Sequence, residues 1–218
     1  LIGETRLDST ITSYESIKYA KTDEGTSVYA DALCGDGSSM VTEFIYWSDY
    51  YNSIISPFYS YSTGRTKETL RSSQVTCRDI DDDGYIEIPE DTSSKKQSSE
   101  ITSQNWVNYG NTVLSHKCYS FSCKRDGYIL VIDDDDFSKV KANYDSESRK
   151  LTIIDKKNKS NVFEIVTLIN SNYSVNDPKY KDYTMIMKNS GFVYLAKVNK
   201  SSDIDINIQT LKDMIKVY

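Results

Sequence analysis

The sequence predicts a mainly β protein whose C-terminal part is of the α+β class. Tyrosine occurs 18 times among 218 residues, against 6 phenylalanines. Tyrosine, like threonine and the branched aliphatic residues, suits the pleated, half-buried surface of a strand. Short runs of these residues alternate with segments rich in Ser, Asn and Asp, as strands alternate with turns. Few stretches carry a helical period, and one of these lies at the C-terminal end.

The first half of the chain is predicted to form short strands separated by turns. Residues Cys34 to Ser39, rich in Gly, Asp and Ser, are a predicted turn between two strands. Asp23-Glu24-Gly25 is the turn before them, and Pro89 ends the last strand. The predicted strands are 16–20, 27–33, 40–47, 75–78 and 85–88, with an edge or irregular strand in the aromatic segment 50–61.

A polar stretch separates the two halves. Residues 91–104, DTSSKKQSSEITSQ, have almost no apolar content, which is typical of a linker or a long surface loop. We therefore predict two domains. Residues 1–103 form a β-rich domain, either propeller-like or a small sandwich, and residues 104–218 form an α+β domain.

The second domain is predicted to be an antiparallel sheet closed by a C-terminal helix. Arg125–Gly127, Asp145–Arg149 and Asn189–Gly191 are predicted hairpin turns. In the last segment Asp203 or Asp205 is the expected N-cap, and Lys212 and Lys216 suit the C-terminal end of the helix dipole. Its apolar residues recur every three or four positions: Ile208, Leu211, Met214, Ile215 and Tyr218. The predicted strands are 112–123, 127–132, 139–144, 150–154, 161–168, 182–188 and 191–198.

Composition excludes several classes of function. The net charge is −6 and no basic stripe is present, so we expect no nucleic-acid partner, because clustered Lys and Arg are needed to contact phosphates. No apolar run reaches the ~18 residues that a membrane-spanning helix needs. The chain begins at Leu1 rather than Met, and we expect membrane association only through a lipid anchor that precedes this segment.

The four cysteines leave two interpretations open. Cys118 and Cys123 lie in one predicted strand, where they face opposite sides about 16 Å apart and cannot bond each other. Cys34 and Cys77 form a disulfide if their loops are neighbours, and otherwise remain buried thiols. His116 is the only histidine, and the cysteine spacing matches no zinc-binding pattern.

The clearest motif is the acidic run Asp79-Ile80-Asp81-Asp82-Asp83-Gly84-Tyr85-Ile86-Glu87. Carboxylates at positions one, three and five of a tight loop converge on one point, and calcium takes several oxygen ligands. Gly84 permits the sharp turn that follows, and Asp82 is expected to point outward. The run therefore predicts a Ca²⁺ site. Its predicted ligands are the carboxylates of Asp79, Asp81, Asp83 and Glu87 and the backbone carbonyl of Tyr85.

The alternatives to this interpretation are an EF-hand and an acidic turn without metal. An EF-hand needs a bidentate Glu at position twelve and a helix on each side. Here Pro89 precedes Glu90 at position twelve, and both flanks are predicted strands. An acidic turn without metal would hold four carboxylates that repel one another. The nine-residue calcium loop therefore fits best.

The loop resembles the FG-GAP (VCBS-type) repeat of integrin-like β-propellers. The shared residues are DIDDDGYIEIP, Asp79 to Pro89, with acids at positions one, three, five and nine. The resemblance implies that Asp79, Asp81, Asp83 and Glu87 hold a mainly structural calcium ion. Position nine of that repeat is usually Asp, so Glu87 is a departure from it.

The whole chain is similar to a family of uncharacterised lipoproteins of Gram-positive gut bacteria. The likeness rests on the IEIP motif at 86–89, the Trp-containing segment 105–109, the Gly-Tyr strand at 126–129 and the terminal amphipathic helix. The last domain is similar to PsbP-like α+β domains. The resemblance implies an extracellular or cell-envelope location with a lipid anchor, and no established activity.

These features predict a non-catalytic, calcium-stabilised binding or scaffold module of the cell surface. Its partner is expected to be a protein or a glycan, with Trp47, Tyr50 and Tyr51 as candidate residues for stacking on sugar rings. The alternative is a glycosidase-like hydrolase, which needs two carboxylates ~5–9.5 Å apart beside a cleft. A third interpretation is a domain that docks through a sheet edge. The acids in apolar strands that the hydrolase would use are Asp31, Glu43 and Glu164.

Overall fold

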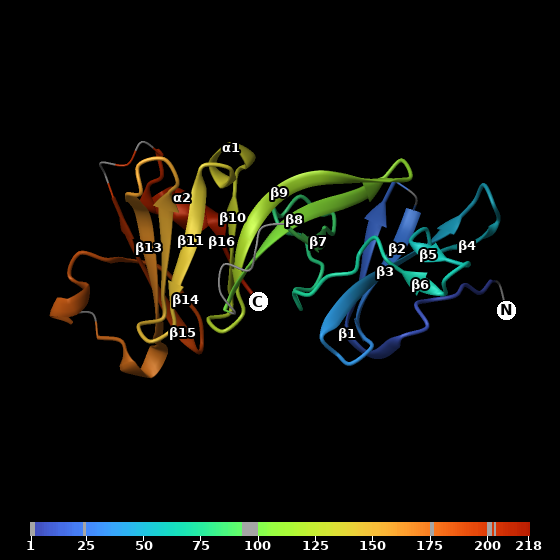
Figure 1. Ribbon diagram of the computed structural model, residues 1–218, viewed down its shortest axis with the longest axis horizontal. Helices are drawn as coiled ribbons and strands as arrows, with labels where there is room; N and C mark the ends of the chain where they lie inside the picture. The colour runs from blue at the N-terminus through green and yellow to red at the C-terminus, as the bar shows by residue number, and fades with distance from the viewer. Residues whose placement is uncertain (1–2, 24, 93–99, 175–176, 200–201, 203) are drawn as a thin grey trace. The chain divides into compact units, whose positions relative to one another are not determined.

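The computed structural model consists mostly of antiparallel strands (Figure 1). It describes residues 3–23, 25–92, 100–174, 177–199, 202 and 204–218. Strands hold 53% and helices 8% of these described residues, so the predicted mainly β class with an α+β C-terminal part is confirmed. The three predicted turns of the second half join β9 (Val113–Cys123) to β10 (Tyr128–Ile132), β11 (Val140–Asp145) to β12 (Lys150–Asp155) and β14 (Thr184–Lys188) to β15 (Phe192–Val198).

The first sheet is an up-and-down meander in the order β1-β2-β3-β4. The short strand β4 lies at its edge, as the aromatic segment 50–61 predicted, and β5 and β6 form a separate two-stranded ribbon. The bounds are β1 (Ile11–Thr22), β2 (Gly25–Cys34), β3 (Ser39–Ser48), β4 (Ser53–Ile55), β5 (Tyr59–Ser60) and β6 (Arg65–Thr66).

The aromatic core of this region lies between the first sheet and two strands of the second. Phe44 of β3 is fully buried, and its ring lies 4.8 Å from that of Tyr29 on β2 and 4.7 Å from that of Tyr109. Ile88 on β7 (Ile88–Asp91) and Val107 and Tyr109 on β8 (Ile101–Gly110) complete the same cluster. Residues of both sheets therefore share one hydrophobic cluster.

The compact units of the structure follow a different division from the predicted domains. Residues 1–92 and 104–118 form one unit, and residues 93–103 and 119–218 form the other. The predicted boundary at 103/104 differs from this division, in which residues 104–118 belong to the first unit and contribute Val107 and Tyr109 to its core. The centre of the predicted linker, 93–99, lies outside the described residues.

Strand β8 is an element that the sequence did not predict. Its first four residues, 101–104, were placed in the linker because they are mostly polar. In the structure β8 lies between β7 and β9 (Val113–Cys123), so both of its edges are hydrogen-bonded. Trp106, near the middle of β8, is fully buried. Hydrogen bonding of β8 to both β7 and β9 thus outweighs the weak strand propensity of its polar residues.

The second and third sheets have five strands each. Their orders are β16-β10-β9-β8-β7 and β11-β12-β13-β15-β14. Three short helical segments join their strands: α1 (Asp134–Phe137) and two 3₁₀ turns at 170–172 and 178–180. The remaining bounds are β10 (Tyr128–Ile132), β11 (Val140–Asp145), β12 (Lys150–Asp155), β13 (Asn161–Ile169), β14 (Thr184–Lys188), β15 (Phe192–Val198), α2 (Ile208–Met214) and β16 (Ile215–Val217).

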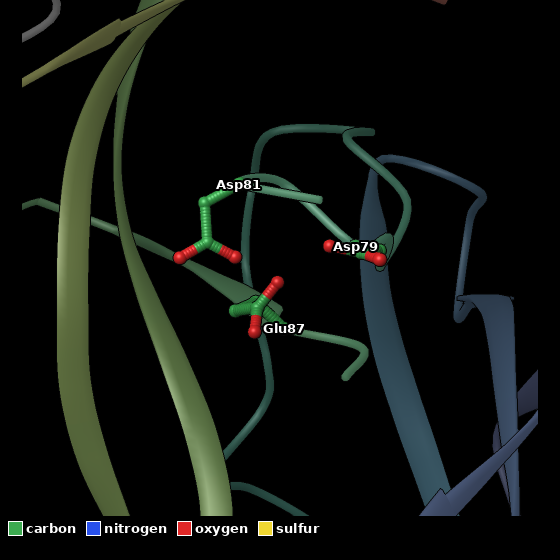
Figure 2. Close-up of side chains that lie close together, drawn as sticks. All are labelled: Asp79, Asp81 and Glu87. Carbon is green, nitrogen blue, oxygen red and sulfur yellow. The ribbon is translucent and has the colours of Figure 1, made fainter. Parts of the chain in front are cut away.

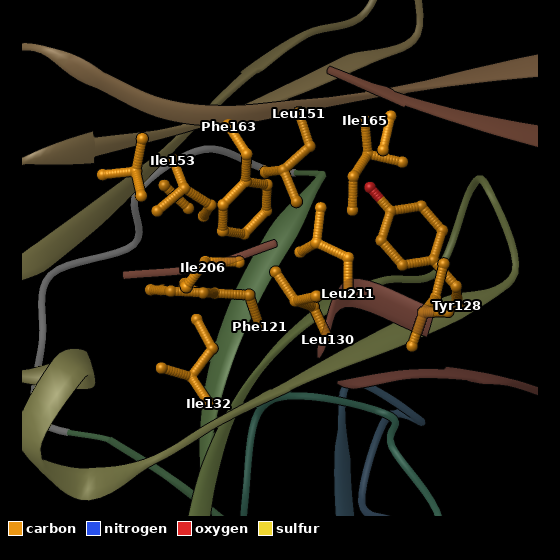
Figure 3. Packing of buried hydrophobic residues seen from close by; sticks show 14 of the residues in the cluster. Phe121, Tyr128, Leu130, Ile132, Leu151, Ile153, Phe163, Ile165, Ile206 and Leu211 are labelled. Carbon is orange, nitrogen blue, oxygen red and sulfur yellow. The ribbon is translucent and has the colours of Figure 1, made fainter. Parts of the chain in front are cut away.

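The core of the second unit shows the alternation expected of strands with one buried face. Leu151 and Ile153 of β12 and Ile165 of β13 point toward Leu130 of β10 and Leu211 of α2 (Figure 3). Helix α2 contacts β10, β14, β15 and β16. The antiparallel sheet closed by a helix, predicted for this part of the chain, is therefore present.

The C-terminal helix is shorter than predicted. It ends at Met214, and residues 215–217 pair with β10 as strand β16. The N-cap is Asn207, whose Oδ1 accepts hydrogen bonds from the backbone N–H groups of Gln209 and Thr210. Asp205 is therefore not the cap, and Asp203 lies outside the described residues. The apolar residues continue the helical period through Ile215, but here the chain pairs with the edge of β10. This pairing satisfies the backbone N–H and C=O groups of both strands.

A buried ion pair connects the first sheet to the segment that leads into the acidic loop. Asp31 of β2 and Arg71 have fully buried side chains, and Arg71 Nη2 lies 2.8 Å from Asp31 Oδ1. Asp31 also accepts hydrogen bonds from the Thr42 hydroxyl at 2.6 Å and from the Cys77 backbone N–H at 3.0 Å. All four cysteines are free thiols, so the alternative of buried thiols holds for Cys34 and Cys77.

The short strands predicted at 75–78 and 85–88 are reduced to a single bridge. Arg78 and Glu87 exchange both backbone hydrogen bonds, and β7 begins only at Ile88. The Cys77 N–H is bonded to the Asp31 carboxylate instead of to a neighbouring strand. The Asp31 side chain thus accepts from the backbone N–H that a longer strand at 75–78 would need for pairing.

Breaking this ion pair should cost more stability than removing both of its charges. Arg71→Met is expected to lower the free energy of unfolding by about 3–5 kcal/mol, because it leaves the Asp31 carboxylate buried without a cation. Asp31→Asn/Arg71→Met should lose less, since the neutral amide still accepts from Cys77. Urea unfolding at pH 7 measures both values.

Arg65→Met is the matched control for this comparison. Arg65 pairs with Asp8 at 3.4 Å, but its side chain is 40% exposed, so its loss should cost no more than about 1 kcal/mol. A double variant less stable than Arg71→Met would contradict the expectation.

Candidate metal centre

The acidic loop at residues 79–87 is closed at its base and turns sharply at two positions. The bridge between Arg78 and Glu87 brings its two ends together, with N···O distances of 3.1 and 2.8 Å. Asp82 and Gly84 have positive φ angles of 63° and 91°. Asp tolerates this region better than most residues, and Gly occupies it freely, so the sequence suits this tight backbone.

The first carboxylate of the loop organises the backbone of the turn. Asp79 Oδ1 accepts a hydrogen bond from the Asp83 N–H at 3.0 Å, and Oδ2 accepts one from the Gly84 N–H at 2.9 Å. Asp83 Oδ1 in turn accepts from the Tyr85 N–H at 2.9 Å. Each carboxylate oxygen has a second lone-pair site, so these bonds leave room for a cation.

Glu87 presents a buried oxygen that lacks a partner. Its side chain is fully buried, and Oε2 accepts a hydrogen bond from the Ile80 N–H at 2.9 Å. Its other oxygen, Oε1, has no hydrogen-bond partner among the described residues. Buried polar atoms are nearly always satisfied, so this oxygen points to a missing partner such as a cation.

Three of the predicted ligands converge on one point. Single carboxylate oxygens of Asp79, Asp81 and Glu87 all lie within 4.8 Å of one another, and Figure 2 shows the three side chains gathered around a common space. Oxygens that surround one calcium ion at ~2.3–2.6 Å lie at most about 5 Å apart. The spacing of these three carboxylates therefore fits a bound calcium ion.

The charges of the cluster perturb the buried glutamate. Burial, followed by the charges of Asp81, Asp83 and Asp79, raises the pKa of Glu87 to about 7, although its bond from the Ile80 N–H acts against this. Carboxylates held this close together without a cation disfavour the ionised form. A divalent ion would reverse the effect, since it would favour the charged form of every ligand.

A lysine that the sequence did not single out completes the site. Lys117 Nζ lies 2.5 Å from Asp83 Oδ2 and 3.0 Å from Asp81 Oδ2. Lys117 lies on β9, far from the loop in sequence. Its hydrogen bonds to the two carboxylates raise the pKa of Lys117, and the bond to Asp83 lowers the pKa of Asp83. Strand 112–123 was predicted, but a strand prediction contains no register against a distant loop, so no signal could place Lys117 here.

The structure places the other two predicted ligands less directly. Asp83 faces Lys117 and does not belong to the converging group of three. Tyr85 is 45% exposed and donates its N–H to Asp83, while the role of its carbonyl remains a prediction. Asp82 is exposed.

The aromatic residues predicted to stack on sugars do not share one pocket. Trp47 lines a shallow apolar depression of about 420 Å³ with residues of β2, β3 and β4, and its indole N–H donates to Asp49 at 3.0 Å. Tyr50 and Tyr51 are 88% and 67% exposed and contact each other edge to face, 4.8 Å apart. They are not among the residues that line the depression.

The candidate acids of the hydrolase alternative are not brought together. Asp31 pairs with Thr42 and Glu43 with Ala30 across β2 and β3, so the two carboxylates point to opposite faces of the sheet. Glu43 is buried and accepts from the Asp8 N–H at 2.7 Å.

Glu164 belongs to the other unit. It accepts a hydrogen bond from the Tyr183 hydroxyl at 2.5 Å and lines a polar pocket beside Lys197. Each of the three candidate acids therefore has partners of its own, and Asp31 and Glu43 lie on opposite faces of their sheet.

Comparison of the chain with protein-family models, curated proteins and solved structures found no match. The likeness to the FG-GAP repeat therefore rests on residues 79–89 themselves. Within the described part of the chain, no helix has the length and apolar character needed to cross a membrane.

The raised pKa of Glu87 predicts a specific pH dependence of the metal-free protein. Its ordinary value of 4.5 applies to the unfolded chain, and its folded value is about 7. Between these values the folded chain binds more protons, so the free energy of unfolding falls as pH rises. In EDTA at pH 8, Glu87→Gln should therefore be more stable than wild type by up to about 3 kcal/mol. At pH 4 this advantage should vanish.

Glu90→Gln is the control for this titration. Glu90 is a half-buried neighbour that accepts a hydrogen bond from Asn105 at 2.8 Å. Urea unfolding in EDTA at pH 4 and pH 8 gives the effect of the same substitution at a residue outside the converging group of acids. A stability difference of Glu87→Gln that is the same at pH 4 and pH 8 would show that the Glu87 carboxylate is not perturbed.

Proposed function

We propose that the chain is a non-catalytic module stabilised by calcium at the loop 79–87. The observation that carries this proposal is the buried side chain of Glu87, whose Oε1 lacks a partner among the described residues and whose carboxylate converges with those of Asp79 and Asp81. A cation at this point would satisfy the orphaned oxygen and offset the mutual repulsion of the acids.

The chemistry of the donors favours calcium over other metals. The group consists of carboxylate oxygens alone, which suit hard cations, whereas zinc and copper sites usually include imidazole or thiolate ligands. Calcium accepts an irregular shell of six to eight oxygens, whereas magnesium needs a near-ideal octahedron, so a group of carboxylates not arranged as an octahedron suits calcium better. Water molecules and a backbone carbonyl would supply the remaining ligands.

The position of the loop supports a structural role for the ion. Asp79 and Glu87 lie at its two ends, which a single bridge joins. Ile80 and Ile88, next to these ligands, are fully buried. An ion held by both ends would add a second cross-link at the base of the loop and so fix these two side chains in the core.

The same proposal places the module outside the cell or on the cell surface, where it binds a protein or glycan or serves as a scaffold. The likeness to exported lipoproteins supports the location. Exposed aromatic side chains, among them Tyr50 and Tyr51, support a binding role, because tyrosine contributes apolar contact area and a hydroxyl at the same time.

Calcium should raise the thermal stability of the wild-type protein. At 100 times its dissociation constant it adds about 2.7 kcal/mol, which corresponds to about 5–10 °C in a protein of this size. Asp81→Asn removes one converging ligand and should abolish most of the shift. Differential scanning calorimetry in EDTA and in excess calcium measures both.

Asp82→Asn is the matched control in the same loop. It removes the same charge from an exposed residue outside the converging group, and asparagine accepts the positive φ of this position. Its calcium-dependent shift should equal that of wild type. No shift in the wild-type protein would overturn the proposal of a calcium site.

If the partner is a glycan, the aromatic residues Trp47, Tyr50 and Tyr51 should contribute to its binding. Trp47→Ala and Tyr51→Ala are expected to weaken binding to any glycan that the wild type retains on an array by about tenfold or more, because buried aromatic anchors dominate such interfaces. Tyr61, 75% exposed and paired with Tyr59, provides the control variant Tyr61→Ala. Unchanged binding by Trp47→Ala and Tyr51→Ala would exclude this surface.

A further inference from the structure

We infer that Lys117 holds the cation position of the loop in the metal-free protein and that calcium binds by displacing its ammonium group. The inference rests on the proposed calcium site and adds to it the residue that sets its affinity. The contacts of Lys117 carry it: one oxygen of Asp81 at 3.0 Å and one of Asp83 at 2.5 Å.

The ammonium group is well placed to act as a substitute cation. It bonds the carboxylates of Asp81 and Asp83, which the sequence predicts as calcium ligands. The side chains of Lys117, Asp81 and Asp83 are each about a third exposed. Partial burial reduces screening by solvent and salt. Lys117 therefore neutralises part of the acidic cluster and keeps the loop ordered before any metal binds.

Lys117 does not meet every need of the cluster. The buried Glu87 Oε1 has no partner while the ammonium group is in place. An ammonium donates three hydrogen bonds and bonds few oxygens, whereas calcium collects six to eight. Calcium can therefore replace the ammonium group with a gain, because the ion would bind Glu87 as well as Asp79 and Asp81.

Lys117 and calcium would share the carboxylate of Asp81. Calcium would lie ~2.3–2.6 Å from one of its oxygens, and the ammonium lies 3.0 Å from its Oδ2. A single and a double positive charge on the same carboxylate repel each other. We therefore expect calcium to displace the ammonium, and the cost of breaking the ion pairs of Lys117 to lower the affinity for calcium.

Isothermal titration calorimetry with calcium chloride tests the competition. Lys117→Met keeps the apolar stem and removes the charge, so its dissociation constant for calcium should fall by about tenfold relative to wild type. The metal-free variant should melt below the metal-free wild type, whereas the calcium-loaded forms should melt close together. Lys117→Arg retains the competing charge and should keep the weaker affinity.

Lys18→Met separates direct competition from the general loss of a positive charge. Lys18 donates to the Cys77 carbonyl, close in sequence to Asp79, and forms no ion pair with the loop carboxylates. Its substitution should change the dissociation constant by less than about twofold, because a charge outside direct contact is screened. An equal gain in Lys18→Met and Lys117→Met would overturn the competition.

A second measurement follows Lys117 in the wild-type protein and needs no variant beyond the one that assigns the signal. In EDTA the ion-paired ammonium protons of Lys117 should give a slowly exchanging NMR signal, absent from Lys117→Arg. Calcium should abolish this signal in step with binding. A signal that persists in the calcium-loaded protein would show that the ammonium stays in place.

The outcomes distinguish this inference from the calcium site on which it rests. Binding by wild type with an unchanged dissociation constant in Lys117→Met overturns the competition and leaves the calcium site standing. Binding by Lys117→Met alone would show that the ammonium excludes calcium from the wild-type protein, which overturns both the displacement and the calcium-stabilised function. Absence of binding in every variant overturns both.

Discussion

The buried ion pair between Asp31 and Arg71 is the constraint on which the geometry of the acidic loop depends. Asp31 stands in the central strand β2, and its carboxylate holds Arg71 and the Cys77 N–H together. The chain therefore enters the loop from a point fixed to the sheet. A charge pair out of contact with water contributes little net stability, but it strongly disfavours any arrangement that separates its members. Asp79 lies only two residues beyond Cys77, so the bond between Cys77 and Asp31 also restricts the position of its carboxylate.

The parts of the fold that depend on local pattern were predictable. Alternation in strands such as β12 and β13 and the turn at Arg125–Gly127 need only nearby residues, and the structure has them. Strand β8 and the end of α2 were not, because pairing partners distant in sequence decide both. The order of the acids in the loop identified Asp79, Asp81 and Glu87 as neighbours. Lys117 could not be identified in this way, since its place follows from the register of β9.

The two buried acids of the first sheet show how position alone determines the environment of a carboxylate. Asp31 has a buried guanidinium beside it, whereas Glu43, on the opposite face, relies on hydrogen bonds from Asp8 and Thr66. Burial accordingly raises the pKa of Glu43. Both serve to attach segments to the sheet. Asp31 holds the segment that begins at Arg71, and Glu43 holds the N-terminal segment and β6.

The first unit is discontinuous in sequence, and this affects how the chain must assemble during synthesis. Phe44 and Phe58 pack on Tyr109, which the ribosome delivers long after them. Until then the nascent chain carries an incomplete aromatic cluster, the kind of surface that chaperones bind. The contact between Phe44 and Tyr109 joins residues far apart in sequence, and such contacts form slowly because a long loop must close first. The acidic loop leaves the ribosome before Tyr109 does, so an ion bound there at that stage would meet a site whose supporting core is still unfinished.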